Sequence, residues 1–270
     1  MKVLTYQDTP AFCDKEKNLR TIESTCAAAA MLGVDTVVFP ELFLTGYQVG
    51  TQAALLAEPI NGPSVEQLRQ IADTHQVALI CGLIEVSEGN LFNAAVAINA
   101  DGKLVAHHRK VFLFGDTEKH LFQPGNAFTA FELNGITCGL SICYDIEFPE
   151  TARCFANQQV KILFNPTANM MPYLAVPKTL ARARALENNM VVVYANLCGH
   201  EGNTEYTGLS AIIGPDGEDL SRAGKDPAIL MTDLSPALHR GLSTQLHDLA
   251  LSSTNNPFPN TQPANRHTTK

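Results

Sequence analysis

A cysteine stands where an apolar strand gives way to a helix, a position that suits a nucleophile. The largely apolar run Ile136–Ile142 predicts a buried strand, and it stops at Cys143. Pro149 and Glu150 then predict the first turn of a helix, because proline fits that turn and an acid favours the helix N-terminus. Open α/β sheets bind ligands at the carboxyl ends of their strands. Cys143 is therefore either a reactive thiol or, as free cysteines commonly are, one more buried core residue.

Two further predicted strands lead to a charged residue. Val34–Phe39 is rich in β-branched residues and leads to Glu41, while Lys103–His108 leads to Lys110. An acid, a cation and the thiol of Cys143 can thus meet at one edge of a sheet. Taken singly, a glutamate after proline is more often a turn cap, and such a lysine is more often a solvated charge. The hypothesis depends on the three together.

Four short motifs surround these residues in a fixed order. They are Phe39-Pro40-Glu41, His108-Arg109-Lys110-Val111-Phe112-Leu113, Glu118-Lys119-His120-Leu121-Phe122-Gln123-Pro124-Gly125 and Cys143-Tyr144-Asp145-Ile146-Glu147-Phe148-Pro149-Glu150. This series strongly resembles the nitrilase superfamily of carbon–nitrogen hydrolases, and the resemblance runs from the first residue to about residue 233. It implies an α/β fold, a four-layer α-β-β-α sandwich, with a triad of Glu41, Lys110 and Cys143. It also implies that Glu118 is an accessory acid and that the chain forms a homodimer or larger homo-oligomer.

The implied triad suits amide hydrolysis through a thioester. An ordinary thiol has a pKa of about 8.5 and is mostly protonated at neutral pH, so Glu41 would act as its general base. Cys143 would attack the amide carbon, while the Lys110 ammonium and the Tyr144 backbone N–H stabilise the oxyanion. Glu41 would then protonate the leaving ammonia and activate the water that hydrolyses the thioester. Glu118 would orient Lys110 or the substrate nitrogen; the alternative is a surface ion pair with a neighbouring lysine.

The residues after the nucleophile narrow the substrate. Tyr144-Asp145 departs from the Trp-Glu that is typical of nitrile-cleaving members and resembles the amidase side of the superfamily. The short segment Val111–Thr117 favours a compact pocket for a small carboxamide. We expect an amidase, with an N-carbamoyl amide hydrolase or a nitrilase as the alternatives. By position, the pocket-lining candidates, whose aromatic members could equally be core residues, are Tyr47, Phe114, Tyr144, Asn165 and Thr167.

Two hypotheses from other classes remain open. A papain-like enzyme could use His107 or His108 as the base for Cys143, because both lie on the strand that precedes the lysine. A non-catalytic amide-binding protein could keep the same fold. The histidines form no H-E-x-x-H motif and the chain has no glycine-rich phosphate loop, so we expect neither a metal nor a cofactor.

Composition restricts the partners and the compartment. The chain has 270 residues and a net charge of −8, which argues against nucleic acid or an anionic membrane surface as a partner. No run of about 20 apolar residues suggests a membrane span. The seven cysteines are odd in number and scattered, with no CxxC pair, so we expect reduced thiols in a cytoplasmic protein.

Helices are predicted to alternate with single strands and hairpins, which indicates a layered fold of one domain over residues 1–251. The local predictions are helices at Asn18–Leu32, Val65–His75 (with Ser64 as N-cap) and Pro177–Asn189, a loop at Phe112–Gly125, a short strand Lys161–Phe164 that ends in Asn165–Asn169, and a hairpin turn at Asn134-Gly135.

Two segments resemble each other: Phe92–Lys103 and Tyr206–Glu218 both read aromatic, apolar, then Asp-Gly and a charge. Either the chain has two halves of similar build, or two unrelated hairpins have converged on the same turn residues. From Ser252 the chain is polar and proline-rich, which predicts a tail, residues 252–270, that is disordered or contacts another subunit.

Overall fold

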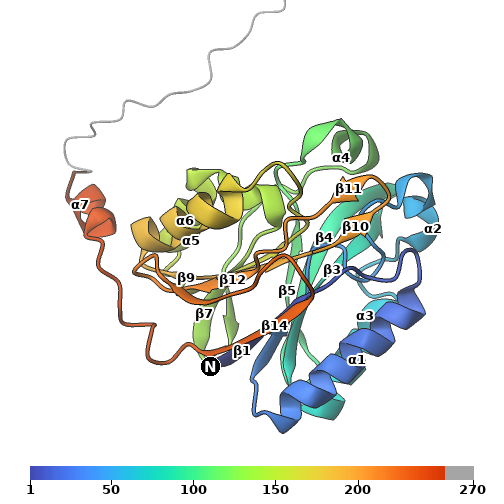
Figure 1. Ribbon diagram of the computed structural model, residues 1–270, viewed down its shortest axis with the longest axis horizontal. Helices are drawn as coiled ribbons and strands as arrows, with labels where there is room; N and C mark the ends of the chain where they lie inside the picture. The colour runs from blue at the N-terminus through green and yellow to red at the C-terminus, as the bar shows by residue number, and fades with distance from the viewer. Residues whose placement is uncertain (253–270) are drawn as a thin grey trace, which may run out of the picture.

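Two six-stranded sheets pack face to face in the computed structural model, which describes residues 1–252 (Figure 1). Helices cover the two outer faces. Those on the first sheet are α1 (Lys15–Met31) and α3 (Pro63–His75), and those on the second are α5 (Pro149–Asn157) and α6 (Ala181–Asn188). The arrangement confirms the expected four-layer α-β-β-α sandwich.

Each sheet is built on the same plan. The first has the order β14-β1-β2-β3-β4-β5 and the second the order β13-β12-β9-β8-β7-β6. The first comprises β1 (Lys2–Gln7), β2 (Thr36–Val38), β3 (Ala78–Ser87), β4 (Asn90–Ile98), β5 (Leu104–Arg109) and β14 (Ala228–Asp233). The second comprises β6 (Phe131–Leu133), β7 (Ile136–Leu140), β8 (Ile162–Thr167), β9 (Val191–Asn196), β12 (Ala211–Ile213) and β13 (Asp219–Arg222).

Three parallel strands followed by an antiparallel hairpin recur in both sheets. In the first, β1, β2 and β3 are parallel and lead to the hairpin β4-β5. In the second, β7, β8 and β9 are parallel and lead to β12-β13. The two similar sequence segments lie on these equivalent hairpins, which supports two halves of similar build.

The remaining elements are short. They are η1 (Gly50–Gln52), α2 (Ala53–Leu56), α4 (Gly115–Leu121), η2 (Cys143–Glu147), the π-helical η3 (Val176–Leu180), β10 (His200–Glu201), β11 (Thr204–Glu205) and α7 (Gln245–Ser252). Within residues 1–252, no helix is both long and apolar enough to cross a membrane. The predicted tail lies outside the described residues, apart from Ser252, which ends α7.

Strand β9 shows why the inner strands read as continuous apolar runs. Val191 and Val193 point into the apolar layer between the sheets, whereas Val192 and Tyr194 point into the layer under the outer helices. All four side chains are fully buried. A strand covered on both faces needs apolar residues at every position, and each buried side chain contributes about 1.5–3 kcal/mol.

The predicted cap of α3 is wrong. The helix begins at Pro63, with Gly62 as N-cap, so Ser64 already lies inside the first turn. The Ser64 hydroxyl donates instead to Glu58 Oε1 at 2.9 Å, and its backbone N–H donates to Glu58 Oε2 at 2.7 Å. A carboxylate from the preceding segment satisfies this helix end, which a local capping pattern does not reveal.

The predicted loop 112–125 and the segment that follows the predicted strand 161–164 are both partly regular. The segment 112–125 contains α4, with acids in its first turn and Lys119 and His120 in its last, as the helix dipole favours. Residues 165–167 extend β8, where Pro166 pairs with Ala195 of the parallel neighbour. Asn-Pro reads as a turn in isolation, but the neighbouring strand holds it extended.

Candidate active site

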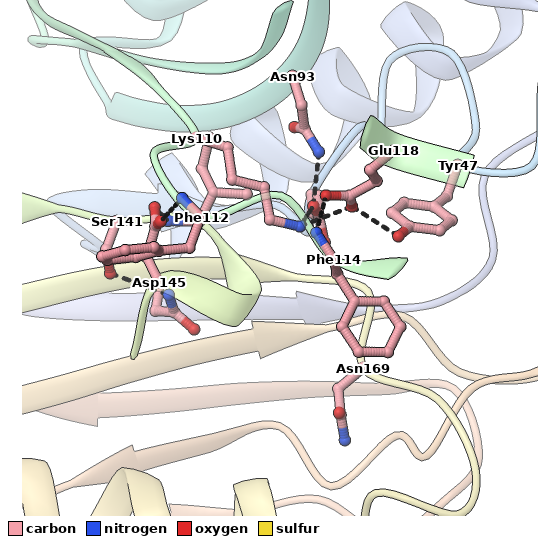
Figure 2. A network of polar contacts seen from close by, with 12 residues as sticks. Tyr47, Asn93, Lys110, Phe112, Phe114, Glu118, Ser141, Asp145 and Asn169 are labelled. Atoms are coloured by element: carbon pink, nitrogen blue, oxygen red, sulfur yellow. Dashed lines mark hydrogen bonds and ion pairs between the residues drawn. The ribbon is translucent and has the colours of Figure 1, made fainter. Parts of the chain in front are cut away.

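Glu41, Lys110 and Glu118 form one buried cluster, and Figure 2 labels the last two. Glu41 follows β2, Lys110 directly follows β5, and Glu118 lies on α4. The Lys110 ammonium donates to Glu41 Oε1 at 2.7 Å and to Glu118 Oε1 at 2.6 Å. The three side chains are at most 3% exposed, so the two ion pairs are shielded from solvent. The structure thus joins three residues that are up to 77 positions apart.

The two oxygens of Glu41 are in different environments. Oε1 accepts both the Lys110 ammonium and, at 2.7 Å, Nδ2 of Asn93 on β4 (Figure 2). Oε2 is buried and has no hydrogen-bond partner among the described residues. Two donors therefore fix the orientation of the carboxylate while one oxygen remains available to accept a proton. Asn93 was not predicted, although a buried amide in an apolar strand is itself a signal of a specific partner.

Gly82 on β3 makes room for this carboxylate. A Cβ at this position would lie 2.2 Å from the backbone nitrogen of Leu42 and 2.9 Å from Cα of Glu41. Any side chain would push the backbone of the Glu41 segment away from the sheet.

Cys143 lies at the sharp turn between β7 and the 3₁₀ helix η2. Its φ of +45° is in the left-handed region, which is uncommon for a residue other than glycine. Strained conformations of this kind concentrate at functional sites, where the surrounding structure holds them. The turn places the thiol in the wall of a narrow cavity, so Cys143 is not simply a core residue.

The charges around the thiol explain its protonation. Burial raises the pKa of Cys143, the nearby Glu41 carboxylate adds to the rise, and Lys110 opposes it. Burial also raises the pKa of Glu41, against the opposing effect of Lys110. For Lys110, burial lowers the pKa, but Glu118 and Glu41 outweigh it and raise the pKa well above its usual value. A neutral thiol beside a permanently charged lysine needs a base before it can react.

Glu118 is buried, which excludes the alternative that it forms a surface ion pair with a neighbouring lysine. Its Oε1 accepts the hydroxyl of Tyr47 at 2.6 Å in addition to the lysine, and its Oε2 accepts the backbone N–H of Phe114 at 2.7 Å. The Tyr47 segment is fixed in turn by Glu201, whose Oε2 accepts the backbone N–H groups of Tyr47 and Gln48 at 3.0 and 2.9 Å. Glu118 therefore links the lysine to the cavity wall.

Asp145 connects the segment of the nucleophile to the segment of the lysine. Its Oδ2 accepts the backbone N–H of Ile142 and contacts Nε2 of His108, both at 3.0 Å. Its Oδ1 accepts the backbone N–H groups of Val111 and Phe112 at 3.1 and 2.9 Å (Figure 2). The side chain is fully buried and its oxygens are occupied by protein groups. Any influence of Asp145 on substrate choice must therefore act through the positions of these two segments.

Both histidines of the papain-like alternative contact carboxylates. Nε2 of His107 lies 2.7 Å from Glu85 Oε2, in a cluster that Arg109 completes with two hydrogen bonds to the same carboxylate. Nε2 of His108 contacts Asp145, and its ring stacks on Phe128. These contacts favour Glu41 over either histidine as the base.

The structure brings together some of the predicted lining residues. Tyr47 and Phe114 line the cavity at Cys143, and Thr167 lies close enough to the sulfur to lower the thiol's pKa. The Tyr144 ring packs edge-on against Phe114 at 5.3 Å. Asn165 lies within the second sheet, where its Nδ2 donates to the Ser141 hydroxyl at 2.9 Å. The lining residues that were not predicted are Glu147, Ala168, Asn169, Met170 and Tyr173.

A family model described as carbon-nitrogen hydrolase matches residues 3–242. The chain belongs to the carbon-nitrogen hydrolase family. It is therefore a hydrolase that acts on carbon–nitrogen bonds, as the resemblance to the nitrilase superfamily implied.

Relatives of this carbon-nitrogen hydrolase include named amidases. It is 40% identical to the "hydrolase in pqqF 5' region" of Pseudomonas protegens, over 92% of this chain and 90% of that one. It is 36% identical to an (R)-stereoselective amidase of a Pseudomonas species, over 75% and 72% of the two chains. A solved mutant of the amidase from Nesterenkonia sp. AN1, which shows Michael addition of acrylamide at its active-site cysteine, is 31% identical with a TM-score of 0.83. That match covers 93% of this chain and 99% of the other.

Proposed function

We propose that this protein is an amidase that hydrolyses a small carboxamide to a carboxylate and ammonia through a thioester on Cys143. The observation that carries the proposal is the buried Glu41 oxygen that has no partner among residues 1–252, close to a thiol whose pKa is raised by burial. The amidase names of the relatives and of the similar solved structure support the same activity.

In the first half-reaction, Glu41 Oε2 takes the thiol proton as the Cys143 sulfur bonds to the amide carbon. The carbonyl oxygen gains negative charge, which the Lys110 ammonium and the Tyr144 backbone N–H stabilise. As the tetrahedral intermediate collapses, the carbon–nitrogen bond breaks and Glu41 gives its proton to the leaving nitrogen. Ammonia departs and the acyl group remains on sulfur.

In the second half-reaction, Glu41 takes a proton from water, and the water oxygen bonds to the thioester carbon. The carbon–sulfur bond breaks, Glu41 returns the proton to the sulfur, and the product leaves as the carboxylic acid, which loses its proton to water to become the carboxylate. Glu118 acts on this sequence by holding the Lys110 ammonium at 2.6 Å, so that the cation is placed before charge develops on the substrate.

Ammonia release tests the proposal. We expect turnover of aliphatic amides in a panel that also contains amino-acid amides, ω-amides, N-carbamoyl compounds and nitriles. Cys143→Ala should abolish it, whereas Cys154→Ala, which removes a half-buried thiol outside the site, should not. Mass spectrometry of acid-quenched enzyme should find the mass of the substrate less ammonia on the peptide that contains Cys143. Faster turnover of nitriles than of their amides, or no ammonia and no adduct from any amide, would overturn it.

Assembly and compartment are also proposed. The family resemblance supports a homodimer or larger homo-oligomer, which light scattering of the purified protein tests. All seven cysteines are unpaired, which supports a reducing compartment such as the cytoplasm. Fractionation of the source cells tests the cytoplasmic location, and recovery of the protein outside the cytoplasmic fraction would contradict it.

A further inference from the structure

A second carboxylate lines the cavity and has no role in the mechanism above. Glu147 is the last residue of η2, which begins at Cys143, and both residues line the same narrow cavity. Its side chain is half-buried, and among the described residues it forms no ion pair and accepts no hydrogen bond. The nearby Arg184 guanidinium donates to the backbone carbonyls of Ile146 and Glu147 and to Glu187, and does not reach this carboxylate.

Among residues 1–252, the cavity wall offers Glu147 no cation. The other lining residues are apolar, aromatic or amide side chains together with the thiol. The ammonium of Lys110 is already shared between Glu41 and Glu118. Burial raises the pKa of the Glu147 carboxyl, and the charges of Lys110 and Arg184, neither of which is hydrogen-bonded to it, oppose the rise. A half-buried carboxylate without a partner is costly, and a cation on a ligand would relieve that cost.

The aromatic residues of the same wall suit a cation as well. The rings of Tyr47, Phe114 and Tyr173 line the cavity, and Phe114 packs edge-on against Tyr173 with a centroid distance of 5.4 Å. Aromatic faces attract ammonium groups, most strongly where water is excluded. A carboxylate and several rings around one narrow space are the chemistry that recognises an amine.

We propose that Glu147 binds a protonated amine of the substrate, so that this enzyme prefers short amino-amides to neutral amides of the same shape. The inference rests on the proposed amidase function and names its substrate class. Three residues separate Glu147 from Cys143, and the four residue steps of 3₁₀ helix between them rise about 8 Å, with both side chains in the wall of the same cavity. The amine therefore lies within a few bonds of the carbonyl carbon that the thiol attacks.

A matched pair of substrates tests the proposal on the intact enzyme. 3-Aminopropanamide and butyramide have the same shape and differ in an ammonium group against a methyl group. We expect kcat/KM to be higher for 3-aminopropanamide than for butyramide. Glu147→Gln should lower the ratio of these two kcat/KM values about tenfold or more, mainly by raising the KM for 3-aminopropanamide, because the substitution removes the charged partner of the amine. Glu150→Gln removes the same charge from an exposed site nearby and should keep the ratio at the wild-type value.

Each outcome has a separate meaning. A ratio that is unchanged in Glu147→Gln, or a wild-type enzyme that prefers butyramide, overturns the role of Glu147 and leaves the amidase proposal standing. An equal fall in Glu150→Gln also overturns it, because the effect would then be one of general surface charge. A wild-type enzyme that releases ammonia from neither amide, nor from any other amide, overturns the amidase function and this inference with it.

Discussion

The substitution Asp145→Asn tests whether one buried carboxylate holds the two catalytic segments together. Asparagine keeps the shape of the side chain but replaces one acceptor oxygen with an NH₂ donor. In the native protein each oxygen meets two partners: Ile142 and His108 on Oδ2, Val111 and Phe112 on Oδ1. Whichever way the amide is oriented, two of these groups face the NH₂.

The magnitude follows from those contacts. A hydrogen bond to a charged acceptor contributes about 1.5–3 kcal/mol, and a buried donor without a partner carries a similar penalty. If the amide oxygen faces Val111 and Phe112, the His108 ring can relieve one conflict by accepting from the NH₂, which leaves the N–H of Ile142 unpaired. We therefore expect the free energy of unfolding to fall by about 2–5 kcal/mol, a large part of the stability of a typical domain.

Urea unfolding measures the stability, and ammonia release measures kcat/KM. We expect kcat/KM for the amide to fall at least about tenfold, because small shifts of the thiol and lysine segments spoil their alignment. Asp116→Asn, an exposed acid on α4, is the control and should change little. A change in unfolding free energy below about 0.5 kcal/mol for Asp145→Asn, with unaltered kcat/KM, would refute the reasoning.

Three further perturbations address the positions of the catalytic groups. Tyr47→Phe removes the 2.6 Å hydrogen bond to Glu118, and we expect kcat/KM to fall about tenfold and the free energy of unfolding to fall by about 1.5–3 kcal/mol. Gly82→Ala places a Cβ 2.2 Å from a backbone nitrogen and should lower both stability and activity, whereas Gly224→Ala meets nothing within 4 Å. In the pH profile of kcat/KM, activity should be lost on the acid side at a pH above 4.5, because burial raises the pKa of Glu41, which must be ionised to act as a base.

Each of these three predictions would be contradicted by a specific result. Wild-type kcat/KM in Tyr47→Phe would show that its hydroxyl does not help to position the acid and lysine pair. Equal effects of the two glycine substitutions would contradict the close approach of backbone at β3. Full activity down to pH 4.5 would mean that Glu41 keeps an ordinary pKa or is not the base.

The sequence predicted the layers and the strand ends because those depend on local patterns. Apolar runs, hairpin turns and helical spacing can each be recognised from residues that are close together in the sequence. The turn Asn134-Gly135 is an example, because both residues have the positive φ that such a hairpin turn requires. The ends of β2, β5 and β7 were accordingly found within a few residues, and with them Glu41, Lys110 and Cys143.

The groups that complete the site could not be predicted, because their partners are distant in sequence. Asn93 meets Glu41 across 52 positions, and Asp145 meets Phe112 across 33. Glu147 was within a quoted motif, but nothing local shows that its side chain lies in the cavity wall without a partner. Such pairings are set by how the two sheets pack.

The measurement that tests the central claim most directly is turnover by Glu41→Gln beside that by His108→Gln. If Glu41 moves the proton between the thiol and the leaving nitrogen, Glu41→Gln should keep the wild-type fold by circular dichroism and lose at least about 100-fold in kcat/KM. His108→Gln should retain far more activity, since its ring contacts Asp145. Turnover by Glu41→Gln within a few-fold of wild type, with activity abolished in a folded His108→Gln, would contradict the account.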